Sequence, residues 1–183
     1  MKKPTDATPP ERKLPEDMTL GELVTLLEKE HANVIVPSIL RLRELADRIL
    51  KEHGCRYEGV LSALANELKS LERELHEHIC KEEHELFPAA LGLRETEEKG
   101  SRKSPVQFSV IPELQHEHEN ATDVFVRIRH LTGNYRLPEE GECLSGLYDG
   151  VRSLETTLLY HIGVEEKVLL PRAMKVAVGK GKL

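Results

Sequence analysis

The stretch HICKEEHELFP at residues 78–88 recurs later in the chain as HIGVEEKVLLP at residues 161–171. Both copies place a histidine, a glutamate, an apolar residue and a proline at identical spacing. A histidine and a glutamate four residues apart lie above one another on a helix, so each copy can present a nitrogen and an oxygen to the same point. The repeat therefore predicts two helices that supply ligands to one dinuclear metal site.

The composition favours an all-α fold. Of the 183 residues, 32% are charged and only 4% are aromatic, with no tryptophan. Abundant leucine and glutamate suit helices better than sheets. The length predicts one domain with a core of its own, plus a tail.

Charge and cysteine content exclude several classes of protein. A net charge of −6 argues against a nucleic-acid or anionic-membrane partner. Cys55, Cys80 and Cys143 are scattered and form no Cys-x-x-Cys pair, so neither a disulfide framework nor a zinc knuckle is indicated. No apolar run reaches the length of a membrane span. We therefore expect a cytoplasmic protein.

Apolar residues at helical spacing predict an up-down-up-down antiparallel four-helix bundle over residues 19–178, made of two helix-pair repeats, 19–91 and 104–178. Residues 1–18 are rich in proline and are expected to be a disordered tail, and residues 179–183 a flexible C-terminus. Pro37 predicts a kink just after His31. The four helices are expected to run from Thr19 to about His53–Gly54, from Leu61 to near Pro88, from Ile111 to before Gly133–Asn134, and from Pro138–Gly141 to Val168.

Four histidines that lie among the apolar residues of these helices are expected to meet at one level of the bundle. In an up-down bundle, residues equally distant from a connecting turn lie at the same height. The midpoints between the sequence positions of successive histidines fall in segments that break helices, at Gly54, near Gly100 and within residues 138–141. The predicted set is His31, His78, His118 and His161, with Glu82 and Glu165 one helical turn away.

A buried pair of carboxylates needs a positive counter-charge. Two divalent ions would supply it, with Glu82 and Glu165 bridging them and two histidines capping each ion. This donor set favours iron, with manganese and zinc as alternatives. His31 or His118 alone would be interpreted as a core histidine. Stripe position selects His118 over His116 as the ligand, and Cys80 is interpreted as a packing residue.

Several phrases together resemble the hemerythrin-like (HHE cation-binding) proteins, closest to the group known for repair of iron centres. They include Glu74–Glu83 with Leu86–Pro88, Glu117–Glu119, Asn134–Tyr135, and Tyr160–Ile162 with Leu170–Ala173, and the likeness covers residues 19–175. The resemblance implies a non-haem di-iron centre on the six residues above and a role in nitrosative and oxidative stress, including repair of iron–sulfur clusters. Members of that group commonly carry an N-terminal domain with adjacent cysteines, whereas residues 1–18 contain none.

Oxygen carriers of this family place two histidines four apart on the third helix, but Leu114 and Thr122 stand at those distances from His118. We therefore expect a protein that handles nitric oxide, oxygen or peroxide, or that donates iron, with a redox or iron-acceptor protein as its partner. Whether this handling is enzymatic stays open. The alternatives are a sensor or carrier module without turnover, and a metal-free structural bundle.

Overall fold

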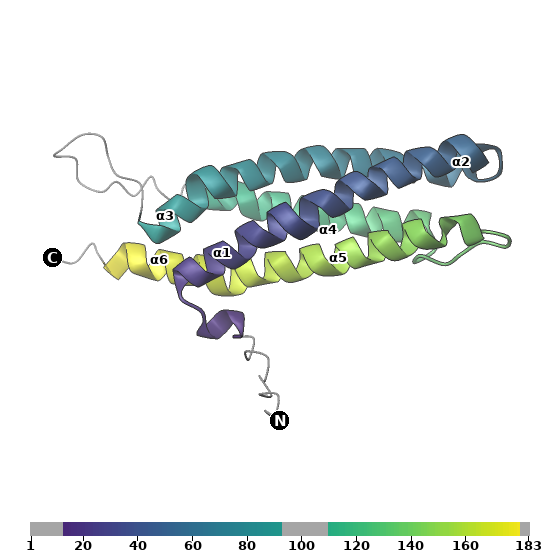
Figure 1. The fold of residues 1–183 in the computed structure, drawn as a ribbon. Coiled ribbons are helices and arrows are strands. Elements are labelled where there is room, and N and C mark those ends of the chain that lie inside the picture. Colours follow the sequence, from purple (N-terminus) through teal and green to yellow (C-terminus); the bar gives the residue numbers. More distant parts are fainter. Residues whose placement is uncertain (1–12, 93–109, 180–183) are drawn as a thin grey trace, which may run out of the picture.

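The computed structural model describes residues 13–92 and 110–179. All regular elements of these two segments are helical, and they lie side by side as a four-helix bundle (Figure 1). The predicted all-α bundle is confirmed, and its connections are consistent with the predicted up-down order. Within the described segments, no helix is long and apolar enough to cross a membrane.

Three of the four arms are built from several helical elements in succession, and the arm formed by α4 is one regular helix. Three of these elements are single π-helical turns, η2, η3 and η6. In chain order the elements are η1 (Pro15–Asp17), α1 (Leu20–Glu30), η2 (His31–Ile35), α2 (Val36–Lys81), η3 (Glu82–Leu86), α3 (Phe87–Leu91), α4 (Ile111–Leu131), η5 (Glu142–Leu144), α5 (Ser145–Val164), η6 (Glu165–Leu169) and α6 (Leu170–Gly179).

Helix α2 supplies parts of two arms, because it folds back on itself (Figure 1). The only non-helical backbone inside it is at Tyr57, with φ −125° and ψ 18°. The first predicted helix was expected to end at about His53–Gly54, so the reversal lies slightly further along the chain. Tyr57 is held there because its hydroxyl donates to the carbonyl of Glu140, at 2.9 Å.

The helix ends follow from local hydrogen bonding. Thr19 and Glu22 form a capping box in which each side chain accepts a hydrogen bond from the other's backbone N–H, which fixes the predicted start of the bundle. At the predicted stop after α4, Gly133, Asn134 and Tyr135 all have φ near 60°, a left-handed conformation that ends a helix.

The described residues cover the predicted tail and linker only in part. Residues 1–12, 93–109 and 180–183 lie outside them. Residues 13–18 were expected to belong to a disordered tail, yet they include the turn η1 and contact the bundle. The carbonyl of Met18 accepts from the Arg172 guanidinium at 2.6 Å, and Lys13 pairs with Glu22 at 2.6 Å.

The apolar core is divided into two clusters. One fills the half of the bundle nearest the α2 reversal and includes Ile39, Leu64, Phe125 and Leu154. The other joins α1, α3 and α6 at the opposite end. Between the clusters, the arms carry buried polar residues in place of leucines, and these residues form the candidate site.

Candidate metal centre

Each π turn begins at a candidate ligand. His31 starts η2, Glu82 starts η3 and Glu165 starts η6. In each turn the carbonyl of this first residue accepts the backbone N–H five residues later, and a proline follows at the sixth position. Proline lacks an N–H, and its ring clashes with the carbonyl four residues earlier in a regular α-helix. The wider turn accommodates the proline, and the same local chemistry therefore sets three ligand positions.

The six predicted residues converge between the two core clusters. All are buried, and Glu82 and Glu165 have no exposed surface. The fourth ligand-bearing arm, α4, is a regular α-helix from Ile111 to Leu131 and contributes His118. The convergence expected from the turn midpoints is therefore present in the structure.

Glu82 faces two histidines, one with each carboxylate oxygen. Its Oε2 lies 3.2 Å from Nε2 of His31, and its Oε1 lies 3.2 Å from Nε2 of His78. These two histidines come from different arms. One carboxylate therefore stands between two separate imidazole groups.

Glu165 repeats this arrangement from the opposite side. Its Oε1 lies 3.2 Å from Nε2 of His161, and its Oε2 lies 3.2 Å from Nε2 of His118. The potential ligand atoms form two groups. In each group, every such atom lies within 4.8 Å of the others. The first group is His31, His161, Glu82 and Glu165, and the second is His78, His118, Glu82 and Glu165.

The donor set fits two divalent cations. All four carboxylate oxygens of Glu82 and Glu165 are buried and have no hydrogen-bond partner among the described residues. Leaving such ions uncompensated costs several kcal/mol each. Two histidine nitrogens and two carboxylate oxygens at each position form a site suited to iron, manganese or zinc. The paired oxygens can bridge the two positions.

The pKa values show how strongly the carboxylates attract positive charge. Burial lowers the pKa of His78, but the adjacent carboxylate of Glu82, with those of Glu165 and Glu117, outweighs burial and raises this pKa to about 9. Burial also lowers the pKa of His161, while Glu165 above all raises it to about 10. Conversely, burial raises the pKa of Glu165, but the charge of His161 brings it well below its usual range. Protons therefore occupy this site when no metal does.

Four further glutamates contact the histidines on the side that faces away from the cluster. Each imidazole has its Nδ1 within hydrogen-bond distance of a glutamate, which fixes the ring and leaves Nε2 directed at the cluster. The two halves of the chain use these glutamates in the same way. The pairs are His31 with Glu83 at 3.1 Å, His118 with Glu166 at 3.1 Å, His78 with Glu117 at 2.9 Å and His161 with Glu30 at 2.9 Å.

These outer glutamates were not among the predicted site residues. A signal for them was present, because each is the sequence neighbour of a candidate ligand. Glu30 and Glu117 precede histidines, while Glu83 and Glu166 follow the bridging glutamates. Lys81 was also missed. It pairs with Glu117 and with Glu113, the latter at 2.6 Å.

Two further predictions meet different outcomes. His118 is buried, whereas His116 is exposed and lies 3.7 Å from Glu119, so the choice between the two histidines is correct as to which faces the interior. Cys80 turns away from His78 as expected, but it is exposed. Its interpretation as a packing residue is wrong, because two residues of helix rotation carry it past the core to the outer face.

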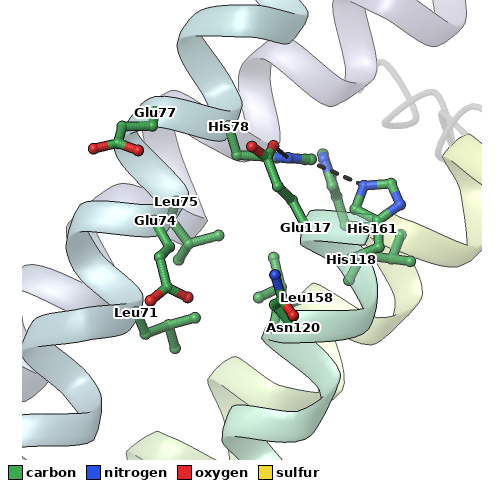
Figure 2. A pocket seen from close by; sticks show the side chains of 12 residues that line it. Leu71, Glu74, Leu75, Glu77, His78, Glu117, His118, Asn120, Leu158 and His161 are labelled. Carbon is green, nitrogen blue, oxygen red and sulfur yellow. Dashed lines mark hydrogen bonds and ion pairs between the residues drawn. The ribbon is translucent and has the colours of Figure 1, made fainter. Parts of the chain in front are cut away.

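A cavity of about 60 Å³ opens beside the cluster, between the second arm of α2 and α4 (Figure 2). Three buried histidines, His78, His118 and His161, line it, as do the exposed residues Glu77 and Asn120. The walls are mostly apolar and include Leu71, Leu75, Ala121, Leu158 and Ile162, and the glutamates Glu74 and Glu117 also line the cavity. The cavity therefore leads from the surface to the imidazoles.

Comparison with known proteins gives one consistent result. Residues 22–173 match the family model described as Hemerythrin HHE cation binding domain. The Iron-sulfur cluster repair protein YtfE of Edwardsiella ictaluri is 30% identical over 175 residues, which cover 92% of this chain and 72% of the relative. Proteins of the same name from Pectobacterium carotovorum and Pectobacterium atrosepticum are 29% and 33% identical over 142 residues, covering 76% of this chain and 58% of each relative.

The chain thus spans little more than half the length of the two Pectobacterium relatives. The matched region contains all six convergent histidines and glutamates and both core clusters. Because the family model covers most of the chain, this protein belongs to the hemerythrin HHE cation-binding family.

Proposed function

We propose that this protein binds two iron ions between its four arms and acts in the repair of iron centres during nitrosative or oxidative stress. The observation that carries the proposal is the set of four buried carboxylate oxygens that have no hydrogen-bond partner within residues 13–92 and 110–179, each facing a different imidazole. The ligands would be His31, His78, Glu82, His118, His161 and Glu165.

Each part of the site has a defined task. Glu82 and Glu165 would contribute to both positions and neutralise the charge of the ions, and two imidazoles would complete each position. The outer glutamates accept from Nδ1–H, so each ring keeps a lone pair on Nε2 for the metal. The flanking leucines exclude bulk water. When bound, iron supplies open coordination positions for nitric oxide, oxygen or peroxide, or is itself passed to a damaged cluster.

The names of the relatives support the repair role. Three of them, matching at 29–33% identity, are called iron–sulfur cluster repair proteins. The proposal carries that role to this chain because the chain supplies the cation-binding bundle matched by the family model. An iron-acceptor protein is the partner that this role requires.

The test measures repair directly. Protein loaded with ferrous iron without oxygen is mixed with an iron–sulfur dehydratase that nitric oxide has inactivated, and recovery of dehydratase activity is followed. We expect the wild-type chain and His116→Ala to restore activity, since His116 lies on the surface. His161→Ala should restore little, because it removes a buried imidazole that faces Glu165.

Two outcomes would contradict the repair proposal. Equal recovery with His161→Ala would show that the cluster is not needed. If the wild-type chain binds iron but restores no activity, while nitric oxide or oxygen binds reversibly, the protein is a sensor or carrier without turnover.

A further inference from the structure

The two copies of the repeated sequence differ in a charge next to the ligands. In HICKEEHELFP at residues 78–88, Lys81 is the third residue after the ligand histidine, whereas HIGVEEKVLLP at residues 161–171 has Val164 at that place. Val164 is buried in the apolar cluster that joins α1, α3 and α6. Lys81 is half-buried and pairs with two glutamates of α4. Only the first copy therefore places a cation at this position.

Lys81 binds the outer glutamate of His78. Its ammonium pairs with Oε1 of Glu117, while Oε2 of the same carboxylate lies 2.9 Å from Nδ1 of His78. Figure 2 shows Glu117 beside this histidine. Only 25% of the Lys81 side chain and 23% of the Glu117 side chain are exposed. Water and salt therefore screen this pair less than they screen an ion pair on the surface.

The other three outer glutamates are not paired with a cationic side chain of this kind. Glu30, Glu83 and Glu166 each contact Nδ1 of a histidine. Within residues 13–92 and 110–179, none of the three forms an ion pair with a lysine or an arginine. The charge of Lys81 thus acts on one imidazole of the four, that of His78, which belongs to the same ligand group as His118.

A cation on the outer carboxylate weakens the imidazole as a metal ligand. A carboxylate that accepts a hydrogen bond from Nδ1–H raises the basicity of Nε2 and strengthens its bond to a metal. A carboxylate that also binds an ammonium accepts this hydrogen bond less strongly, because its negative charge is partly neutralised. The positive charge of Lys81 in addition repels a cation bound by His78. Both effects weaken the same metal position.

We propose that Lys81 is a positioning residue that acts through Glu117 and makes the His78–His118 position the weaker of the two metal positions, so that its iron leaves first. This inference rests on the proposed function, because it requires iron at both positions. The His31–His161 position lacks such a lysine in the described part of the chain and retains its iron longer. Release in a fixed order suits a protein that passes iron to a damaged cluster.

A purely structural role for Lys81 predicts the opposite result. The lysine also pairs with Glu113 at 2.6 Å, and it thereby joins the second arm of α2 to the first turns of α4. If Lys81 only held these arms together, its removal would loosen them and speed up the release of iron. If Lys81 weakens His78 as a ligand, its removal slows the release.

The first test measures the release of iron to a chelator. Protein loaded with two ferrous ions without oxygen is mixed with a coloured ferrous chelator, and we expect the wild type to release one iron fast and one slowly. Loss of an outer partner changes metal affinity by about 10- to 100-fold, so removal of the cation that weakens this partner should slow the fast phase by about three- to tenfold in Lys81→Met. Lys81→Arg keeps the charge and should keep the fast phase. Lys81→Gln replaces Lys81→Met if the latter fails to fold.

Two control variants separate the charge on Glu117 from other effects. Lys69→Met removes an exposed lysine from the same arm of α2 and should release iron as the wild type does. Glu113→Gln removes the more exposed partner of Lys81 and leaves the lysine on Glu117, so its fast phase should not become slower. Slowing in either control that equals the slowing in Lys81→Met would overturn the inference.

The second test measures the reduction potential of the bound irons. A stronger imidazole donor favours ferric over ferrous iron. The mean of the two one-electron reduction potentials should therefore fall in Lys81→Met and return to the wild-type value in Lys81→Arg. Anaerobic redox titration measures these potentials. An unchanged mean potential in Lys81→Met would show that Lys81 acts only as a contact between helices.

The outcomes distinguish this inference from the proposed function. Two irons that leave the wild type in a single phase would overturn the inference alone, as would a fast phase that is unchanged or faster in Lys81→Met. Less than one bound iron per wild-type chain would overturn the proposed function, and this inference with it.

Discussion

At the scale of single residues, the site is a set of buried charges held by their neighbours. The ligand candidates could be selected from sequence because a histidine on a leucine stripe interrupts a clear helical pattern. Their outer partners could not, because Glu30, Glu83, Glu117 and Glu166 lie off the stripes, where most glutamates are solvated. Only the tertiary arrangement shows that each one contacts a histidine from another arm.

We expect metal affinity to fall when one of the four outer glutamates is made neutral. Glu30→Gln removes the charge behind His161, whose Nδ1 lies 2.9 Å from Glu30. Loss of such a partner typically weakens metal binding by about 10- to 100-fold. Glu28→Gln, on an exposed face of the same helix, serves as the control and should bind metal as the wild type does. Competition with a coloured chelator measures both affinities, and equal values would contradict this role of Glu30.

The histidine pKa values predict how the stability of the metal-free protein depends on pH. Folding raises the pKa of His78 from 6.5 to about 9 and that of His161 from 6.5 to about 10. The folded state therefore holds protons that the unfolded state releases. The resulting stabilisation is complete below pH 6.5 and is lost as pH rises through 9 and 10. The melting temperature of metal-free protein should fall between pH 7 and 10, and this fall should be smaller, but still present, in His78→Gln, which retains His161.

At the scale of elements, the π turns explain what helical periodicity misses. A proline six residues after His31, Glu82 and Glu165 is visible in the sequence, and it correctly predicts a disturbed helix after His31. The stripe pattern tolerates one extra residue because positions three and four apart both lie on the same face. The sequence alone therefore does not distinguish a kink from a widened turn.

Removing the extra residue of η3 should uncouple the site from the core. Deleting Glu85 would restore α-helical spacing and rotate the residues beyond it by about 100° relative to His78 and Glu82. Phe87, which is buried and stacks on His31, would then leave its place. We expect the deletion to lower unfolding free energy by about 3 kcal/mol or more, while Glu85→Ala costs little. Denaturant unfolding measures both, and equal stabilities would contradict a structural need for the π turn.

The turn between α4 and α5 depends on a buried hydrogen bond. Tyr135 has φ 61°, which is unusual for a residue with a side chain, and its hydroxyl donates to the buried carboxylate of Glu155 at 2.7 Å. Tyr135→Phe should cost about 1–3 kcal/mol because Glu155 loses this donor. Tyr148→Phe is the matched control, since its hydroxyl makes no hydrogen bond with the described residues. Similar losses in the two variants would show that this hydrogen bond contributes little.

At the scale of the whole molecule, the fold brings together residues from four arms that are far apart in sequence. The bundle was predictable because long leucine stripes admit few other folds. The level at which the histidines meet was predictable because turns fix the relative heights of the arms. The cavity was not predictable, because an apolar stripe does not show where a small residue such as Ala121 borders an open space.

The site also interrupts the core. Apolar clusters lie on both sides of it, so the histidines and glutamates occupy a layer that would otherwise hold leucines. This layer contributes stability only when its charges are balanced. Metal binding and bundle packing are therefore expected to be coupled throughout the molecule.

The central claim is that two metal ions lie between Glu82 and Glu165. Anaerobic titration with ferrous iron, followed by metal analysis of the desalted protein, tests it most directly. The structure predicts two irons per chain in the wild type and in Glu85→Gln, and a clear loss in Glu82→Gln, which keeps the side-chain volume but removes the bridging charge. Less than one iron per chain in the wild type, or two irons retained by Glu82→Gln, would contradict the account.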